Sequence, residues 1–95
     1  MSYELVWHPD ALKEWKKLGE NTKPPLKQKL IRRLEEPCIP KAALHNMRDC
    51  YKIKHGSFRL IYQVFADSAT IKVLAVGHRD KLAAYKAADN RLEDD

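Results

Sequence analysis

The amino-acid sequence predicts an α+β fold: a small, mostly antiparallel sheet of four strands with helices packed mainly on one face. Two patterns predict it. A short alternating run comes first, followed by two segments with apolar residues at helical spacing. Three β-branched and aromatic runs then precede one more helical segment, which gives the order strand, helix, helix, strand, strand, strand, helix. At 95 residues, the chain is expected to form a single domain over residues 1–95.

The first forty residues are expected to hold one strand and two helices. Residues 3–7 alternate in polarity and predict a strand that ends before Pro9. Apolar residues at helical spacing over 10–18 and again over 26–34 predict two helices, and Pro37 stops the second. The outward face of that second helix carries four basic residues: Lys27, Lys29, Arg32 and Arg33. We interpret this face as solvated, with contact to a nucleic-acid backbone as the alternative.

The rest of the chain is expected to form a three-stranded meander and a final helix. Runs of β-branched and aromatic residues predict strands over residues 51–54, 58–65 and 70–76. Turns at His55-Gly56 and at residues 66–68 would join these strands as antiparallel neighbours. Asp80 is then expected to cap the last helix. The apolar face of that helix consists of Leu82, Tyr85, Ala88 and Leu92.

Positive charge is concentrated in the second half of the chain. The net charge is +5, from 18 Lys and Arg against 13 Asp and Glu. Residues 41–81 hold eight basic and three acidic side chains, an excess of +5, whereas residues 82–95 are acidic on balance. Such a concentration indicates an anionic partner such as nucleic acid.

Several other classes of protein and site are not expected. No apolar run approaches the roughly 20 residues that span a bilayer, and the first residues do not resemble a secretion signal. Cys38 and Cys50 match no metal-binding spacing, so we interpret them as reduced thiols of a cytoplasmic protein, with one disulfide as the alternative. No histidines lie four residues apart and no carboxylates cluster with them, so neither a metal site nor a cofactor is expected.

Four basic side chains are expected to meet at one rim of the sheet. Residues two apart in a strand share a face, so Lys52 and Lys54 project together. Gly56 in the following turn brings the next strand back alongside and places Arg59 close to Lys54. Arg79 directly follows the third strand of the meander. Because like charges in such proximity repel, we expect the cluster to meet an anion.

An RNA phosphodiester fits this group of side chains. Its cleavage by the adjacent 2′-hydroxyl develops negative charge on a five-coordinate phosphorus, which guanidinium groups match with paired hydrogen bonds. A neighbouring cation disfavours the charged form of a lysine amine, so a lysine in such a cluster can accept a proton. From the residues alone, an RNA-binding module without catalysis is the alternative.

Two ring-bearing side chains complete the expected site. Tyr85, near the start of the last helix, offers a flat face on which a nucleobase can stack. His78 is expected beside the cations and is the best imidazole candidate for acid or base catalysis. The remaining histidines are interpreted as structural or solvated: His8, His45 and His55.

Four stretches of the chain are specific enough to compare with a known family: residues 11–18, 49–54, 58–64 and 76–79. In order and over almost the whole chain, they resemble the RelE family of bacterial toxins, in the RelE/ParE superfamily. The resemblance implies a metal-independent, ribosome-dependent endoribonuclease that cuts mRNA in the ribosomal A site. The 2′-hydroxyl would attack and leave a 2′,3′-cyclic phosphate and a 5′-hydroxyl.

The resemblance also implies a role for each site residue. Lys54 would be the general base on the 2′-hydroxyl, with Lys52 supporting charge beside it. Arg59 would stabilise the phosphorane oxygens, and Arg79 would stabilise charge and help protonate the leaving 5′-oxygen. Tyr85 would stack on a base of the codon and align it for in-line attack.

Three further positions have secondary roles in this comparison. His78 stands where the family commonly has a lysine, so the proton donor is either this imidazole or another member of the site. Lys81 and Arg48 are expected to make supporting contacts with RNA.

Partners follow from the same resemblance. A cognate RelB-like antitoxin would wrap the toxin and block its cleft, and the pair would bind operator DNA through the antitoxin. The ribosome, through its A site and ribosomal RNA, and mRNA would be the other partners, and no membrane is involved. A ParE-like inhibitor of DNA gyrase, with the same fold and no RNA cleavage, is the other alternative.

Overall fold

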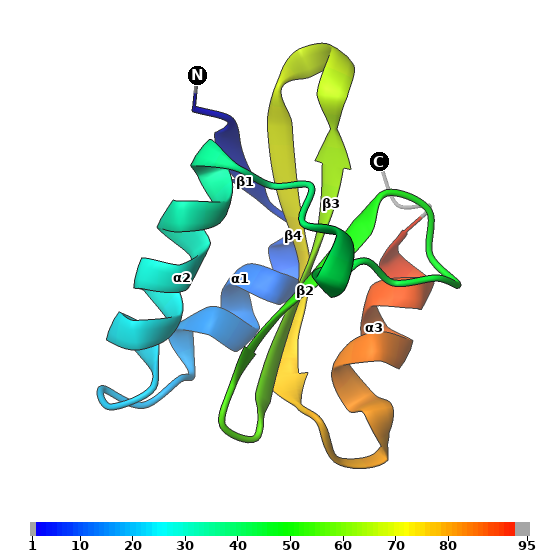
Figure 1. Ribbon diagram of the computed structural model, residues 1–95. Helices are drawn as coiled ribbons and strands as arrows, with labels where there is room; N and C mark the ends of the chain where they lie inside the picture. Colours follow the sequence, from blue (N-terminus) through cyan, green and yellow to red (C-terminus); the bar gives the residue numbers. More distant parts are fainter. Residues whose placement is uncertain (1, 93–95) are drawn as a thin grey trace.

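The computed structural model describes residues 2–92, which form a sheet with helices on both sides (Figure 1). The predicted α+β class and the predicted order of elements are confirmed. The helices and strands are β1 (Glu4–Trp7), α1 (Pro9–Lys16), α2 (Lys23–Glu35), β2 (Cys50–His55), β3 (Phe58–Phe65), β4 (Thr70–His78) and α3 (Ala83–Arg91). Three short 3-10 turns lie between them: η1 (Pro40–Ala42), η2 (Ala66–Ser68) and η3 (Asp80–Leu82).

The strands lie in the order β1-β4-β3-β2, so β2 is an edge strand. As predicted, β2, β3 and β4 form an antiparallel meander. The first strand, β1, lies parallel to β4, but it pairs only with Thr70 to Val73. From Leu74 onward, the outer edge of β4 therefore has no strand beside it among residues 2–92.

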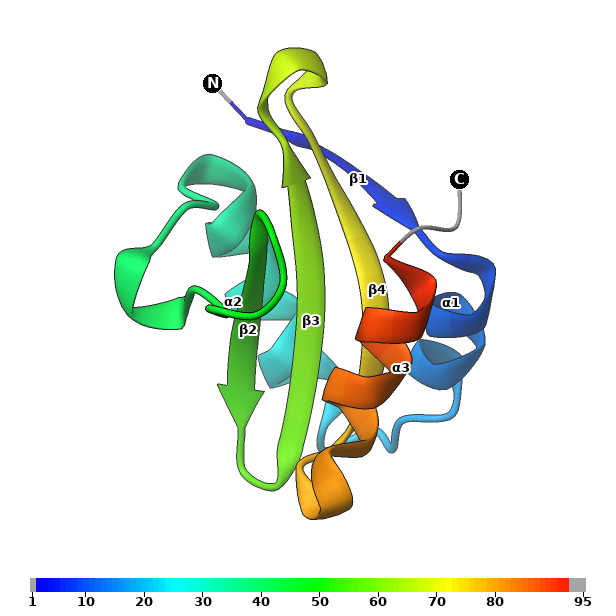
Figure 2. The same ribbon diagram turned by 90° about the vertical axis from the view of Figure 1, so that its right-hand side faces the viewer.

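Both faces of the sheet are covered, and each has its own core. Figure 2 shows α3 on one face and α1 with α2 behind the sheet on the other. The core under α1 and α2 contains Ala11, Leu26, Leu30, Ile53, Leu60, Tyr62, Val64, Ile71, Val73 and Val76. The core under α3 contains Met47, Cys50, Ile61, Leu74, Ala75, Ala84 and Ala88. Two helices thus share one face, while the third covers the other.

A β-bulge in β4 widens the smaller core. Ile61 pairs with Ala75, but the next residue, Tyr62, pairs with Val73. Leu74 is therefore an extra residue, and both it and Ala75 belong to the core under α3.

The start of the last helix differs from the prediction. Asp80 does not cap α3, because it lies inside the 3-10 turn η3, whose preceding residue is Arg79. Leu82 occupies the N-cap position of α3 in a left-handed conformation with φ of 56°, and its own side chain makes no capping hydrogen bond. Leu82 is also 57% exposed, so it does not belong to the apolar face of the helix. The predicted face is kept by Tyr85, Ala88 and Leu92, which pack on the smaller core.

His8, the two cysteines and the polarity of the helices can also be compared with the predictions. His8 has a structural role, since its Nδ1 accepts a hydrogen bond of 3.1 Å from the backbone N–H of Asp10 at the start of α1. Cys38 and Cys50 are both free thiols, as predicted. Across residues 2–92, the helices are too short or too polar to cross a membrane.

Candidate active site

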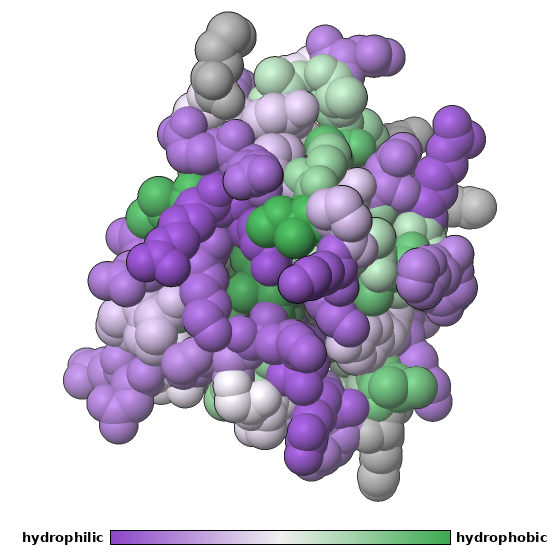
Figure 3. All heavy atoms as spheres, in the orientation of Figure 1, coloured by the Kyte–Doolittle hydropathy of each residue, from purple (hydrophilic) through white to green (hydrophobic). Residues whose placement is uncertain are grey.

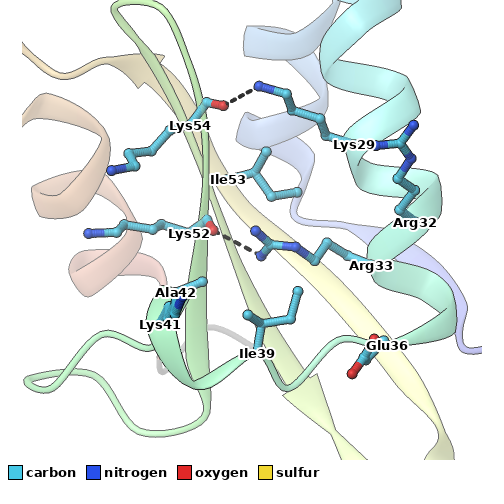
Figure 4. A pocket seen from close by; sticks show the side chains of 10 residues that line it. All are labelled: Lys29, Arg32, Arg33, Glu36, Ile39, Lys41, Ala42, Lys52, Ile53 and Lys54. Atoms are coloured by element: carbon cyan, nitrogen blue, oxygen red, sulfur yellow. Dashed lines mark hydrogen bonds between the residues drawn. The ribbon is translucent and has the colours of Figure 1, made fainter.

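The edge strand β2 presents two lysines on the face that α3 covers. Cys50 lies in the core under α3, and residues two apart in a strand share a face, so Lys52 and Lys54 point the same way. Figure 4 shows both amines directed away from α2. Ile53 points the other way, into the core under α1 and α2. Lys52 is half-buried and Lys54 is exposed, which gives both ammonium groups access to a ligand.

Arg59 on β3 joins these lysines. It is directly opposite Lys54 in the antiparallel pair, and directly opposite residues project from the same face. Its Nη1 donates hydrogen bonds to the carbonyl oxygens of Gly56, at 2.9 Å, and Phe58, at 2.7 Å. These bonds hold the guanidinium at the end of the sheet where β2 turns into β3. The hairpin turn itself requires Gly56, whose φ is +57°.

Arg79 lies at the same end of the sheet. Its backbone N–H donates to the carbonyl of Ser57 in the hairpin turn, at 2.8 Å, and it immediately precedes η3. The first turn of α3 is close by, because a methyl group on Gly77 would lie 3.7 Å from Cβ of Ala84. Since Gly77 is directly opposite Arg59, the hairpin, Arg79 and the start of α3 meet in one region.

Tyr85 borders this region from the helix side. It is half-buried and packs on the core that contains Ile61. Ile61 is directly opposite Lys52. The ring therefore lies on the same face as the lysines, as the sequence predicts.

No carboxylate among residues 2–92 neutralises the cations of the site. None of Lys52, Lys54, Arg59 and Arg79 forms an ion pair with an acidic residue in the part of the chain that the structure describes. Their positive charge is thus available to an anion bound from outside.

The prediction that His78 lies beside the cations is wrong. His78 is directly opposite Phe58, and the two rings are 4.4 Å apart. It shares a face with Val76, which belongs to the core under α1 and α2, and it lines a hollow with Glu14 and Leu18 of the α1 region. The alternation of side chains along β4 thus places the imidazole on the opposite face from Lys54.

The two expected supporting residues do not complete the cluster. Arg48 has a side chain that is 93% exposed and lies 3.7 Å from the carboxylate of Asp49, just before β2. It is therefore at the far end of β2 from the hairpin. The backbone of Lys81 lies in η3, near the cluster, but its side chain is outside the described part of the structure.

A basic groove, which the sequence did not reveal as such, separates α2 from the outer edge of β2. It has a volume of about 570 Å³. Figure 3 shows apolar side chains between hydrophilic ones on this side of the molecule. The groove is lined by Lys29, Arg32, Arg33, Glu36, Ile39, Lys41, Ala42, Lys52, Ile53 and Lys54. Two cations of α2 turn inward here, so the predicted solvated face of that helix is only partly solvated.

An ion pair over the free edge of β4 also could not be predicted from the sequence. Glu14 of α1 and Arg91 of α3 form two hydrogen bonds, of 2.8 and 3.0 Å. The same carboxylate accepts the N–H of Val76 at 3.1 Å, and the same guanidinium donates to the carbonyl of Leu74 at 2.9 Å. The pair replaces a neighbouring strand at this edge and joins the two helices that lie on opposite faces.

Neither the two cysteines nor any described group of metal-binding side chains adds reactive chemistry to the site. Burial, and to a smaller extent the charge of Asp49, raises the pKa of the Cys50 thiol to about 12, so it stays protonated and unreactive. Cys38 is exposed but lies in the loop after α2. Among residues 2–92, no three His, Cys, Asp or Glu side chains gather in a way that could hold a metal ion.

Comparison with known proteins identifies the family. The family model described as the ParE toxin of the type II toxin–antitoxin system parDE matches residues 5–83. The mRNA interferase toxin RelE of Escherichia coli K12 is 43% identical over 94 residues, which are 97% of this chain and 99% of the relative.

Solved structures agree. A variant of the E. coli toxin RelE in the free state matches with a TM-score of 0.88 at 42% identity, over 96% of this chain and 98% of that chain. The toxin of the intact E. coli RelBE toxin–antitoxin complex matches with a TM-score of 0.80 at 43% identity, over 83% of this chain and 99% of that chain. Sequence, fold and the basic face of the sheet together show that this chain belongs to the RelE family of bacterial toxins, within the superfamily that also includes ParE.

Proposed function

We propose that this protein is an endoribonuclease toxin that cuts mRNA in the ribosomal A site and is neutralised by a cognate antitoxin. The observation that carries the proposal is the basic cluster of Lys52, Lys54 and Arg59 on one face of the sheet, which has no ion pair with any acidic residue that the structure describes. Its support comes from the near full-length identity to a protein named as an mRNA interferase toxin. Such a cluster suits the negative charge of a phosphodiester.

The reaction needs a base, charge stabilisation and alignment. Lys54 in its neutral form takes the proton of the 2′-hydroxyl, whose oxygen then bonds to the adjacent phosphorus. Lys52 and Arg59 stabilise the charge that develops on the phosphorane oxygens. As the bond from phosphorus to the 5′-oxygen breaks, Arg79 stabilises the charge on that oxygen, which takes a proton from solvent, and Lys54 returns the proton of the 2′-hydroxyl to solvent. The products are a 2′,3′-cyclic phosphate and a 5′-hydroxyl, and no water is consumed.

Tyr85 supplies alignment rather than proton transfer. A base of the codon stacked on its ring is held so that the 2′-oxygen, the phosphorus and the 5′-oxygen are in line. His78 has no role in this scheme, because its ring packs against Phe58 on the opposite face. The His78→Ala variant should therefore keep the cleavage rate within a few-fold of the parent.

The partners follow from the function. A toxin of this kind acts on ribosomes in the cytoplasm. It also requires a RelB-like antitoxin, and the E. coli RelBE toxin–antitoxin complex supports this second partner. An antitoxin with a DNA-binding part would carry the pair to operator DNA. The excess positive charge of the toxin suits an acidic segment of that antitoxin.

The decisive experiment maps the 3′ ends of a message threaded through purified ribosomes with an open A site. We expect cleavage within the A-site codon and none on free RNA. Arg79→Ala should lower the single-turnover rate by orders of magnitude while antitoxin binding stays close to that of the parent. Equal cleavage of free RNA, or an undiminished rate in Arg79→Ala, contradicts the proposal.

The same experiment separates the two alternatives. Binding of ribosomes or RNA without cleavage would indicate a non-catalytic RNA-binding module. Because the matching family model is named for ParE, a DNA gyrase supercoiling assay should run in parallel. Inhibition of gyrase with no RNA cleavage would favour the ParE-like alternative.

A further inference from the structure

The outer edge of β2 is held by two cations of α2. Lys29 Nζ donates to the carbonyl oxygen of Lys54 at 2.7 Å, and Arg33 Nη1 donates to that of Lys52 at 2.9 Å (Figure 4). An edge strand normally presents such carbonyls to solvent or to another strand. Here, each is occupied by a side chain of a helix.

The spacing of the two contacts fits both elements. Residues four apart in an α-helix are separated by about 6 Å along its axis. Residues two apart in a strand are separated by about 6.6 Å. Lys29 and Arg33 are therefore in step with Lys54 and Lys52, and α2 takes the place of a neighbouring strand at this edge.

The two carbonyls that accept these hydrogen bonds belong to the two residues whose side chains enter the basic cluster. In β2, the backbone oxygens of Lys52 and Lys54 point to α2 while their amines point to the opposite side (Figure 4). Fixing the carbonyls fixes the twist of the strand, and thus the direction in which each amine leaves it. From this geometry, we infer that Lys29 and Arg33 are positioning residues for RNA cleavage, holding β2 so that both lysines meet the scissile phosphate. This inference rests on the proposed function.

Arg33 is itself anchored more firmly than Lys29. Its Nη1 also lies 3.0 Å from the hydroxyl of Tyr62, and its guanidinium carbon lies 5.9 Å from the centre of that ring. Tyr62 is fully buried, and its hydroxyl donates to the carbonyl of Pro37 at 2.6 Å. Arg33 thus ties β2 to the core, whereas Lys29 reaches its carbonyl from a more exposed position. We expect the loss of Arg33 to have the larger effect.

Arg32 provides a matched control. It lines the same groove on the same helix, but it is exposed and its side chain has no hydrogen bond or ion pair with any described residue. Arg32→Met and Arg33→Met remove the same charge and keep similar apolar length. A difference between them reports the contact with β2 and not the general attraction of RNA to positive charge.

The test compares Lys29→Met, Arg33→Met and Arg32→Met by single-turnover cleavage at saturating ribosome–message complex. Affinity is measured separately with a message that carries a 2′-deoxynucleotide at the scissile position. Misplacement of catalytic groups by about 1 Å can cost around a hundredfold, so we expect a loss of about tenfold for Lys29→Met and up to a hundredfold for Arg33→Met. Affinity should match that of Arg32→Met, and Lys29→Arg should restore the rate because it keeps a donor at that position.

A second readout does not depend on cleavage. Amide hydrogen exchange over residues 50–55 should be faster in Lys29→Met and Arg33→Met than in the parent, and unchanged in Arg32→Met. If Arg33→Met does not fold, Lys29→Met and its rescue by arginine decide the question. Rates equal to that of Arg32→Met, or unchanged exchange in β2, overturn the inference. If the parent protein does not cleave at all, the proposed function is wrong. The exchange data then test separately whether Lys29 and Arg33 hold β2 in place.

Discussion

The two faces of the sheet differ in what their side chains contribute. Under α1 and α2, the core is made mostly of large apolar side chains such as Leu26, Leu60 and Tyr62. Under α3, the fully buried residues that the helix contributes are the small Ala84 and Ala88, and its larger side chains Tyr85 and Leu92 are only partly buried. At the hairpin end, this second face gives way to the basic cluster. We therefore expect the first face to supply most of the stability and the second to leave room for the proposed chemistry.

The faces are joined where β4 has no neighbouring strand. The Glu14–Arg91 pair spans that edge and links α1 on one face to α3 on the other. Since α3 also carries Tyr85, this link connects the stable face to one wall of the proposed active site. The contrast between the faces can be tested by changes in the free energy of unfolding.

Leu26→Ala should cause the largest loss of stability. The side chain is fully buried in the core under α1 and α2, and a truncation of this kind usually costs about 2–5 kcal/mol through lost burial and the cavity left behind. Ala88→Gly on α3 should cost only about 1 kcal/mol, mainly through helix propensity. Urea unfolding curves measure both. Equal losses would mean that the two faces contribute alike.

Glu14→Gln should have the next largest effect. The variant removes the negative charge of Glu14 from beside Arg91, whose side chain is 16% exposed, which should cost about 2 kcal/mol. A double-mutant cycle with Arg91→Met, again by urea unfolding, isolates the coupling, which should be about 1–3 kcal/mol. Additive losses would show that the pair does not join the faces.

The presence and order of the strands were predictable from runs of β-branched and aromatic residues, although not all of their ends were. The bounds of β3 agree with the prediction because the β-branched and aromatic run is continuous there. The neighbouring strands are longer than predicted, since Phe58 pairs with both His55 and His78 and so extends β2 and β4 to the end of the hairpin. The grouping of Lys52, Lys54 and Arg59 followed from alternation and a short turn, which are also local.

What the sequence could not show depends on contacts between distant residues. Glu14 and Arg91 are 77 positions apart, and the side of α2 that faces the edge of β2 depends on how the helix docks. The position of His78 differs from the prediction because alternation along β4 places its side chain on the face of Val76, although it is next to Arg79 in the sequence. The N-cap of α3 is not predictable from the sequence, because Leu82, with its left-handed backbone, is not a residue type that marks a helix start.

Raising the pH should lower the free energy of unfolding through the core under α3, by less than the Glu14→Gln substitution does. Burial raises the pKa of Cys50 from 9.0 to about 12, so the folded state keeps the thiol proton that the unfolded chain loses above pH 9. The contribution of Cys50 is therefore complete below pH 9 and declines as pH rises toward 12, by up to about 1.4 kcal/mol per pH unit. Between pH 9 and 10, we expect a loss of up to about 1 kcal/mol from this group.

The measurement is the free energy of unfolding in urea at pH 8, 9 and 10 for the parent and for Cys50→Ala. Subtracting the two slopes removes the contribution of groups that titrate in both proteins, including Tyr62, whose pKa burial also raises. Identical slopes would show that the Cys50 thiol is not protected in the folded state. Alkylation at pH 8 gives an independent check, since only the exposed Cys38 should react in the folded protein.

The smallest effect on stability, and of opposite sign, is expected at the basic cluster. Lys54 is exposed and directly opposite Arg59, and like charges placed opposite each other destabilise a sheet. Lys54→Gln should therefore raise the free energy of unfolding by a few tenths of a kcal/mol, while the single-turnover cleavage rate falls by orders of magnitude. Lys27→Gln, an exposed charge on α2, serves as the control and should change neither quantity by much. A clear loss of stability in Lys54→Gln would mean that this lysine supports the fold, and that the division between a stabilising face and a functional face is wrong.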